Sequence, residues 1–199
     1  MDKNIIGKLI IKAHQTSVSK GFYKELRPNE ERLMLVISEL GEGLEAHRKN
    51  KRADVETYLN CVNATDILES DKPAYIKQSF EDLVKDSMED ETADAVIRMF
   101  DFLGYLDKQI SLSKLYSSFE HVCAEYAIDS RDRDNLGKFM FEITKIVCKF
   151  GDSLDSGVAG EILGMLYVLS LEFKFDLMKH IELKMQYNAT REALHGKKY

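Results

Sequence analysis

The sequence contains no tryptophan, two prolines and three cysteines in 199 residues. The prolines, Pro28 and Pro73, interrupt the chain at two points, and no segment sustains the alternation of apolar and polar residues that strands show. The cysteines, Cys61, Cys123 and Cys148, lie far apart and lack the short spacing of a zinc or redox motif. We therefore expect an all-α chain whose thiols stay reduced, as in a cytoplasmic protein.

Long apolar runs are also missing. The longest nearly apolar run, residues 162–171, is too short to cross a bilayer, and the N-terminal residues lack the apolar stretch of a secretory signal. The net charge of -6 opposes binding to nucleic acids or to anionic membranes. We expect a cytoplasmic protein with no nucleic-acid partner and no membrane partner.

Amphipathic helical patterns cover nearly the whole chain. The segment between residues 53 and 80 is mixed and partly polar, and we expect one or two short helices in it. The longer predicted helices end within a few residues of their turn signals. The main ones cover about 3–18, 29–49, 81–108, 111–127, 135–150, 158–175 and a last stretch that reaches His195.

Two acidic motifs of similar form stand out, Glu39-x-x-Glu42 and Glu91-x-x-Asp94. Carboxylates three residues apart share a helix face, so two packed helices would bring all four together. Such a cluster is costly without a cation, because like charges raise each other's pKa and each loses hydration. A hard divalent cation such as Mg²⁺ takes oxygen ligands and would relieve the repulsion. The alternative is that the acids lie on solvated helix faces.

The residues around these motifs favour a site. Gly41 and Gly43 flank Glu42 inside the helix, where each glycine costs ~1 kcal/mol relative to alanine. This predicts the close approach of another helix or of a ligand. Arg98 lies one turn beyond Asp94, so we expect it to orient that carboxylate.

The strings SELGEGLEA at 38–46 and EDETADAVIR at 89–98 resemble the MazG-like all-α nucleotide pyrophosphohydrolases, which include dimeric dUTPases and dCTP pyrophosphatases. The resemblance implies a MazG-like helical bundle that uses Mg²⁺ and hydrolyses a nucleoside triphosphate to the monophosphate and pyrophosphate. The spacer between the motifs is longer than is usual in the family. The implied metal ligands are Glu39, Glu42, Glu91 and Asp94, with Glu39 or Glu42 also taking the proton of the attacking water.

The C-terminal segment carries a stripe of hydrogen-bond donors. At helical spacing, Lys184, Asn188, Arg191 and His195 share one face, and such side chains suit phosphate oxygens. The alternative is an ordinary basic helix end that stops at Gly196.

This tail is similar to that of the dimeric dUTPases, in which the tail contacts the nucleotide. The resemblance therefore implies substrate contacts from Lys184, Asn188, Arg191 and Lys197. The segment from Ala13 to Tyr23 also resembles the family's first helix and its exit, which makes His14, Phe22 and Tyr23 candidates for recognising or stacking on a base.

The second half resembles a degenerate copy of the first. Aligning Glu142 with the first acidic motif places Lys145 where its second acid would be, and aligning Glu161 with the second motif loses its aspartate. Chance similarity between amphipathic helices is the alternative. We predict an active half at 1–110 and a degenerate half with the basic tail at 111–199, packed as one compact unit. Both a homodimer and a pseudo-dimeric monomer fit this division.

Together these patterns predict a Mg²⁺-dependent nucleoside triphosphate pyrophosphohydrolase, with the base and sugar left open. The alternative is a non-catalytic helical protein that binds a nucleotide or a partner and whose acids serve only solubility.

Overall fold

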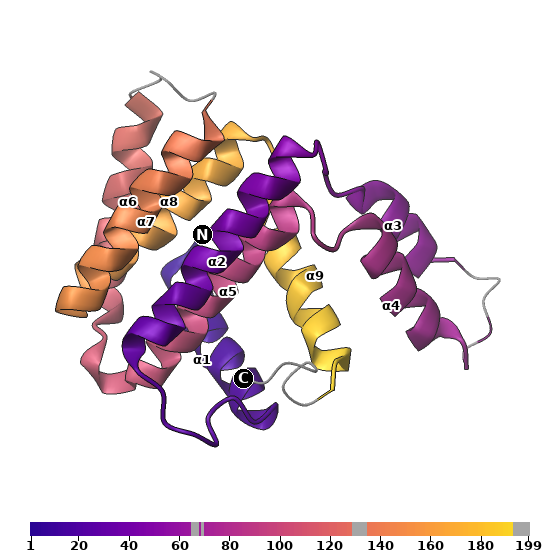
Figure 1. Cartoon of the computed structure of the whole chain (residues 1–199), viewed down its shortest axis with the longest axis horizontal. Helices are drawn as coiled ribbons and strands as arrows, with labels where there is room; N and C mark the ends of the chain where they lie inside the picture. Colours follow the sequence, from indigo (N-terminus) through magenta and orange to yellow (C-terminus); the bar gives the residue numbers. More distant parts are fainter. Residues whose placement is uncertain (65–67, 69, 129–134, 193–199) are drawn as a thin grey trace.

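The computed structural model describes residues 1–64, 68, 70–128 and 135–192. These residues form nine α-helices, one short 3-10 helix and no strand (Figure 1), which confirms the predicted all-α class for the described part of the chain. The elements, in chain order, are α1 (Lys3–Ser19), α2 (Asn29–Arg48), α3 (Val55–Val62), α4 (Lys72–Leu83), α5 (Met88–Leu106), η1 (Asp107–Gln109), α6 (Leu112–Ile128), α7 (Leu136–Ser153), α8 (Ser156–Glu172) and α9 (Leu177–Thr190).

Helix α5 is the centre of the fold. Helices α1, α2, α8 and α9 all pack against it. Its start differs from the prediction of a helix that begins near Phe80, because Asp86 adopts a left-handed φ of 57° and separates α4 from α5. The Ser87 side chain then caps α5 by accepting the backbone N–H of Asp90.

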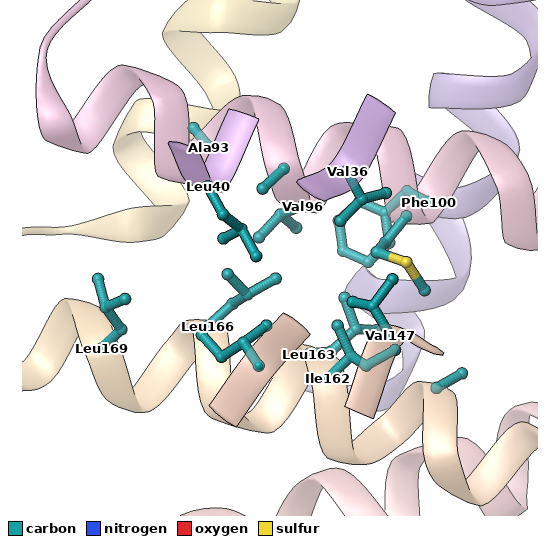
Figure 2. Close-up of a cluster of buried hydrophobic side chains, with 14 of the residues drawn as sticks. Val36, Leu40, Ala93, Val96, Phe100, Val147, Ile162, Leu163, Leu166 and Leu169 are labelled. Atoms are coloured by element: carbon teal, nitrogen blue, oxygen red, sulfur yellow. The ribbon is translucent and has the colours of Figure 1, made fainter. Parts of the chain in front are cut away.

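The main core lies between α2 and α5 on one side and α7 and α8 on the other (Figure 2). Val36 and Leu40 from α2 and Val96 and Phe100 from α5 face Leu166 and its apolar neighbours on α8. All five of these side chains are at most 2% exposed. Burial of this apolar area is the main stabilising contribution to the packing of the two layers.

The two halves of the chain pack their helices in the same order. Helices α1 and α2 both contact α5, and helices α6 and α7 both contact α8. The halves then join through α2 with α7 and α5 with α8. At Gly160 on α8, an added Cβ would lie 2.1 Å from the carbonyl oxygen of Leu115 on α6, so only glycine permits this close helix contact.

The α3–α4 hairpin projects away from the bundle (Figure 1). It confirms the expectation of short helices between residues 53 and 80, although α4 extends three residues further, to Leu83. The hairpin forms a second small core with α9, built from Tyr58, Phe80, Val84, Leu183 and Tyr187. No helix in the described part of the chain is long and apolar enough to cross a membrane.

Candidate metal centre and adjoining pocket

Three carboxylates from two helices converge at the centre of the molecule. Glu39 comes from α2, and Glu91 and Asp94 come from α5. One carboxylate oxygen of each lies within 4.8 Å of the others, which is close enough for a single cation to contact all three. The acidic motifs of the two helices therefore meet in space, although 51 residues lie between Glu39 and Glu91 in the sequence.

Gly43 on α2 lies close to side chains of α5 and α7. A Cβ at Gly43 would lie 3.5 Å from the Cβ of Glu91 and 3.1 Å from the Cε of Met140. The predicted close approach is therefore found at Gly43. It is not found at Gly41, where an added Cβ would have no neighbour within 4 Å among the described residues.

Burial makes the two glutamates of this group, Glu39 and Glu91, hard to ionise. Glu39 is 5% exposed and Glu91 is 3% exposed. Burial raises the pKa of Glu91 to about 9, against the opposing charge of Lys184, and the charges of nearby Asp90 and Asp94 contribute to the rise. Burial also raises the pKa of Glu39, with a further contribution from the charge of Asp94. Glu91 therefore holds its proton at neutral pH until a cation replaces it.

A lysine from α9 enters the same cluster. The Nζ atom of Lys184 lies 2.6 Å from Oδ2 of Asp90 and 2.8 Å from Oδ2 of Asp94. Burial alone would lower the pKa of Lys184, but the charges of Asp94 and Asp90 outweigh burial and raise it. The predicted substrate contact of Lys184 thus falls on a side chain that is 3% exposed and paired with two aspartates.

Asp90 is a deeply buried member of this cluster. Its Oδ2 also accepts the backbone N–H of Asp86 at 3.0 Å, and its Oδ1 has no hydrogen-bond partner among the described residues. Burial raises the pKa of Asp90 to about 6, although the charge of Lys184 opposes the rise and that of Asp94 contributes to it. Asp90 therefore connects the start of α5 to the cluster.

Arg98 completes the cluster. Its Nε donates to Oε1 of Glu39 at 3.2 Å, whereas the sequence predicted that it would orient Asp94. The difference arises because Arg98 and Glu39 lie on facing helices, so their contact depends on how α2 and α5 pack.

The charges of the cluster do not balance. Lys184 and Arg98 supply two positive charges. The four carboxylates supply four negative charges when all are ionised, so a net negative charge of about two remains unneutralised. A divalent cation has the charge and the preference for oxygen ligands that fit this deficit. The four carboxylates are those of Glu39, Asp90 and Glu91, which are buried, and of Asp94, which is partly buried.

The fourth predicted ligand, Glu42, lies apart from the convergent oxygens. Its side chain is exposed, and it is not a member of the group formed by Glu39, Glu91 and Asp94. Its charge is still close enough to contribute to the raised pKa of Glu39. A role for Glu42 as metal ligand or base stays a prediction.

A pocket adjoins the carboxylates between α1, α5 and α9. Its lining includes Asp94 and Arg98 of the cluster and Asn188 and Arg191, which the sequence predicted as substrate contacts. Phe22 supplies an aromatic wall. A ligand in this pocket would touch both an acidic edge at Asp94 and several hydrogen-bond donors.

The predicted tail residues Asn188 and Arg191 line this pocket from different backbone conformations. Asn188 lies on α9, and its Oδ1 has no hydrogen-bond partner among the described residues. Arg191 lies just beyond α9, in extended backbone conformation, so the predicted continuous helical stripe is wrong at this residue. Lys20, at the end of α1, contacts the end of α9. Its Nζ donates to the carbonyl oxygens of Ala189, at 2.9 Å, and of Arg191. The predicted contact Lys197 and the stripe residue His195 lie outside the described residues.

His14 is separated from the predicted substrate contacts. Its Nδ1 lies 3.0 Å from Oδ1 of Asp101, and the same oxygen accepts the Tyr23 hydroxyl at 2.7 Å. His14 lines an open groove between α1 and the end of α5, not the pocket beside Asp94. Its predicted role in substrate binding has no geometric support from this placement and stays a prediction.

Sequence reasoning did not select Asp90 as a site residue. The available signal was its position four residues before Asp94, which places both on one face of α5. The pairing of both aspartates with Lys184 depends on the inward orientation of α9, which local sequence patterns do not determine.

No family model, no curated protein and no solved structure matches this chain.

Proposed function

We propose that this protein is a Mg²⁺-dependent nucleoside triphosphate pyrophosphohydrolase with a MazG-like helical bundle. The observation that carries the proposal is the convergence of Glu39, Glu91 and Asp94 from two packed helices. The adjoining pocket, with Asn188 and Arg191 in its lining, supports the proposal because a triphosphate needs donors beside the cation. The resemblance of both acidic strings to the pyrophosphohydrolase family supplies the reaction class.

The acidic residues would bind the metal ion and accept a proton. Glu39, Glu91 and Asp94 would hold Mg²⁺, with Glu42 as a candidate fourth ligand. The ion, when bound, polarises phosphoryl oxygens and lowers the pKa of a coordinated water. Glu39 or Glu42 accepts the proton of the attacking water, and that water attacks a phosphorus of the triphosphate, with the α-phosphorus as our choice.

Other side chains bind and position. Arg191 and Asn188 hold phosphate oxygens, and Arg191 offsets the charge of the departing pyrophosphate. Arg98 fixes the carboxylate of Glu39 through the bond at 3.2 Å. Lys184 acts on the reaction through Asp94, whose carboxylate it holds, so it is a positioning residue in this scheme.

The direct test is a screen of the purified protein against nucleoside triphosphates with Mg²⁺, reading pyrophosphate against phosphate. We expect pyrophosphate and monophosphate from at least one nucleotide, and a loss of roughly 10²-fold or more in kcat for Asp94→Asn, since a metal ligand is removed. Glu45→Gln is the matched control, because Glu45 is an acid on α2 that pairs with Arg48 on the surface. Absence of pyrophosphate release from every nucleotide would reject the proposal.

A non-catalytic nucleotide-binding protein is the second candidate. The observation in its favour is Lys184, whose ammonium neutralises part of the acidic cluster without any metal. This candidate predicts nucleotide binding that is unchanged by Mg²⁺ and by Asp94→Asn. Calorimetric titration of a nucleotide with and without Mg²⁺ separates the two candidates.

A further inference from the structure

A second pocket lies around Arg32, on the side of α2 and α5 nearer the start of α2. We call it the Arg32 pocket. Its charged lining comprises Arg27, Glu31 and Arg32 around the first turns of α2, and Arg98 and Asp101 on α5. Tyr23 contributes an aromatic wall.

Arg32 is the unusual member of this lining. Its side chain belongs to a residue that is 9% exposed, and its Nε is buried without a hydrogen-bond partner among the described residues. The guanidinium carbon lies 4.3 Å from the ring centroid of Tyr23 and 4.5 Å from that of Tyr105. These cation–π contacts give Arg32 an electrostatic partner but no hydrogen-bond acceptor.

The other charged groups of the pocket have partners. Arg27 pairs with Glu31 at 3.3 Å, and Arg98 pairs with Glu39 outside the pocket. Asp101 accepts hydrogen bonds from the Tyr23 hydroxyl, at 2.7 Å, and contacts His14 at 3.0 Å. The pocket therefore contains carboxylates that are already engaged and one guanidinium whose Nε has no acceptor in the described part of the chain.

An unpaired buried cation is costly. Cation–π contacts contribute about 2 kcal/mol when desolvated, which is less than the several kcal/mol lost when a charge leaves water. An anion in the pocket would supply the acceptor that the Arg32 guanidinium lacks at Nε among the described residues.

We infer that the Arg32 pocket binds a small oxyanion, a phosphate or a carboxylate group of a ligand. A guanidinium offers two parallel N–H donors to the oxygens of either group, and the aromatic wall would cover an apolar part of the same ligand. None of the carboxylates that we propose as metal ligands lines this pocket, which adjoins the pocket beside Asp94 and shares Phe22, Arg98 and Asp101 with it. The inference does not depend on the proposed catalytic activity.

The test is calorimetric titration of the metal-free protein with inorganic phosphate and, separately, with acetate. Metal is removed first, so that phosphate cannot bind through a cation at the acidic cluster. We expect phosphate or acetate to bind, and Arg32→Met to weaken binding about tenfold or more, because a charge-assisted hydrogen bond contributes about 1.5–3 kcal/mol. The arm that binds more tightly identifies the class of oxyanion.

Arg48→Met is the matched control, because Arg48 is an exposed arginine at the other end of α2 that pairs with Glu45. Its binding should equal that of the wild type. If circular dichroism shows that Arg32→Met is unfolded, Arg32→Lys serves instead, since it keeps the charge and loses the paired donors. Binding of neither anion by the wild type, or equal binding by the Arg32 and Arg48 variants, would overturn the inference.

Discussion

Glu91 is the residue whose protonation most affects the acidic cluster. Its pKa rises from an ordinary value of 4.5 to about 9 in the folded protein, first because it is buried and then because Asp90 and Asp94 lie nearby. Between these two pH values the folded protein holds a proton that the unfolded chain releases. Folding and proton binding are therefore linked at this residue.

The sign of this linkage gives a prediction. The stability contributed by the retained proton is fully present below pH 4.5 and is lost as the pH rises towards about 9, so the free energy of unfolding of the metal-free protein should fall over that range. Urea unfolding at several pH values measures the slope. Glu91→Gln carries no titrating group at this position, so its slope should be flatter. Equal slopes for the two proteins would contradict the assignment.

Lys184 is the buried cation that pairs with Asp90 and Asp94. Lys184→Met keeps most of the length of the side chain and removes the charge, which leaves Asp90 and Asp94 without their buried cation. We expect a loss of about 3–5 kcal/mol in the free energy of unfolding, measured with urea. Lys179→Met is the control, because Lys179 lies on the same helix and pairs with Glu182 near the surface. A loss no larger than that of the control would show that the pairing contributes little.

The sequence and the structure agree on some residues and differ on others. The spacing within each acidic motif was enough to place Glu91 and Asp94 on one face of α5, because that relation is local. The sequence predicted Asp94 as the partner of Arg98, but Arg98 hydrogen-bonds Glu39, because this contact depends on the packing of α5 against α2. The orientation of Lys184 was also missed, since a stripe of polar residues on α9 gives no signal that one of them turns inward.

The α3–α4 hairpin packs against α9 through the small second core. Phe80 on α4 is 1% exposed and stacks on Tyr187 of α9 with ring centroids 4.5 Å apart. The Tyr187 hydroxyl donates to Glu81 at 2.8 Å. The hairpin is thus attached to the same helix that brings Lys184 to the acidic cluster.

Phe80→Ala should loosen this attachment. Removing a buried phenylalanine costs about 3–5 kcal/mol, and the small second core has few other large side chains to compensate. We expect faster amide hydrogen exchange in α3, α4 and α9, with little change in α6 and α7, because those two helices belong to the main core. Leu68→Ala is a suitable control, since Leu68 is 71% exposed. Uniform acceleration in all helices would show that the hairpin is not a separate unit of stability.

Helix existence was easier to predict than helix limits. The apolar spacing in α1, α2 and α7 indicated each helix within a few residues of its observed bounds. The break between α4 and α5 was missed because it depends on the left-handed backbone of Asp86, which the sequence does not mark with glycine or proline.

At the scale of the molecule, the two halves repeat one packing order with different chemistry. The acids of the second half that align with the motifs are paired with lysines on the surface, Glu142 with Lys145 at 2.8 Å and Glu161 with Lys149 at 3.2 Å. Within the described residues, the group formed by Glu39, Glu91 and Asp94 is the one cluster of this kind. This difference supports the proposal of an active half and a degenerate half.

The proposal predicts a single class of Mg²⁺ site per chain. The double variant Glu142→Gln, Glu161→Gln should bind Mg²⁺ with unchanged affinity and stoichiometry in calorimetric titration, because both acids lie in the second half of the chain, on α7 and α8. The variant Glu91→Gln should lose most of the binding. A drop in stoichiometry in the double variant would place a metal site in the second half.

Lys184 comes from the helix that is synthesised after every other described helix. While the chain emerges from the ribosome, α2 and α5 can meet before α9 exists, and at that stage Asp90 and Asp94 lack the ammonium that accompanies them in the finished protein. The acidic centre is therefore complete only after α9 has been synthesised. A chain that terminates early, before α9, would keep its carboxylates but lose the counter-ion that makes their burial tolerable.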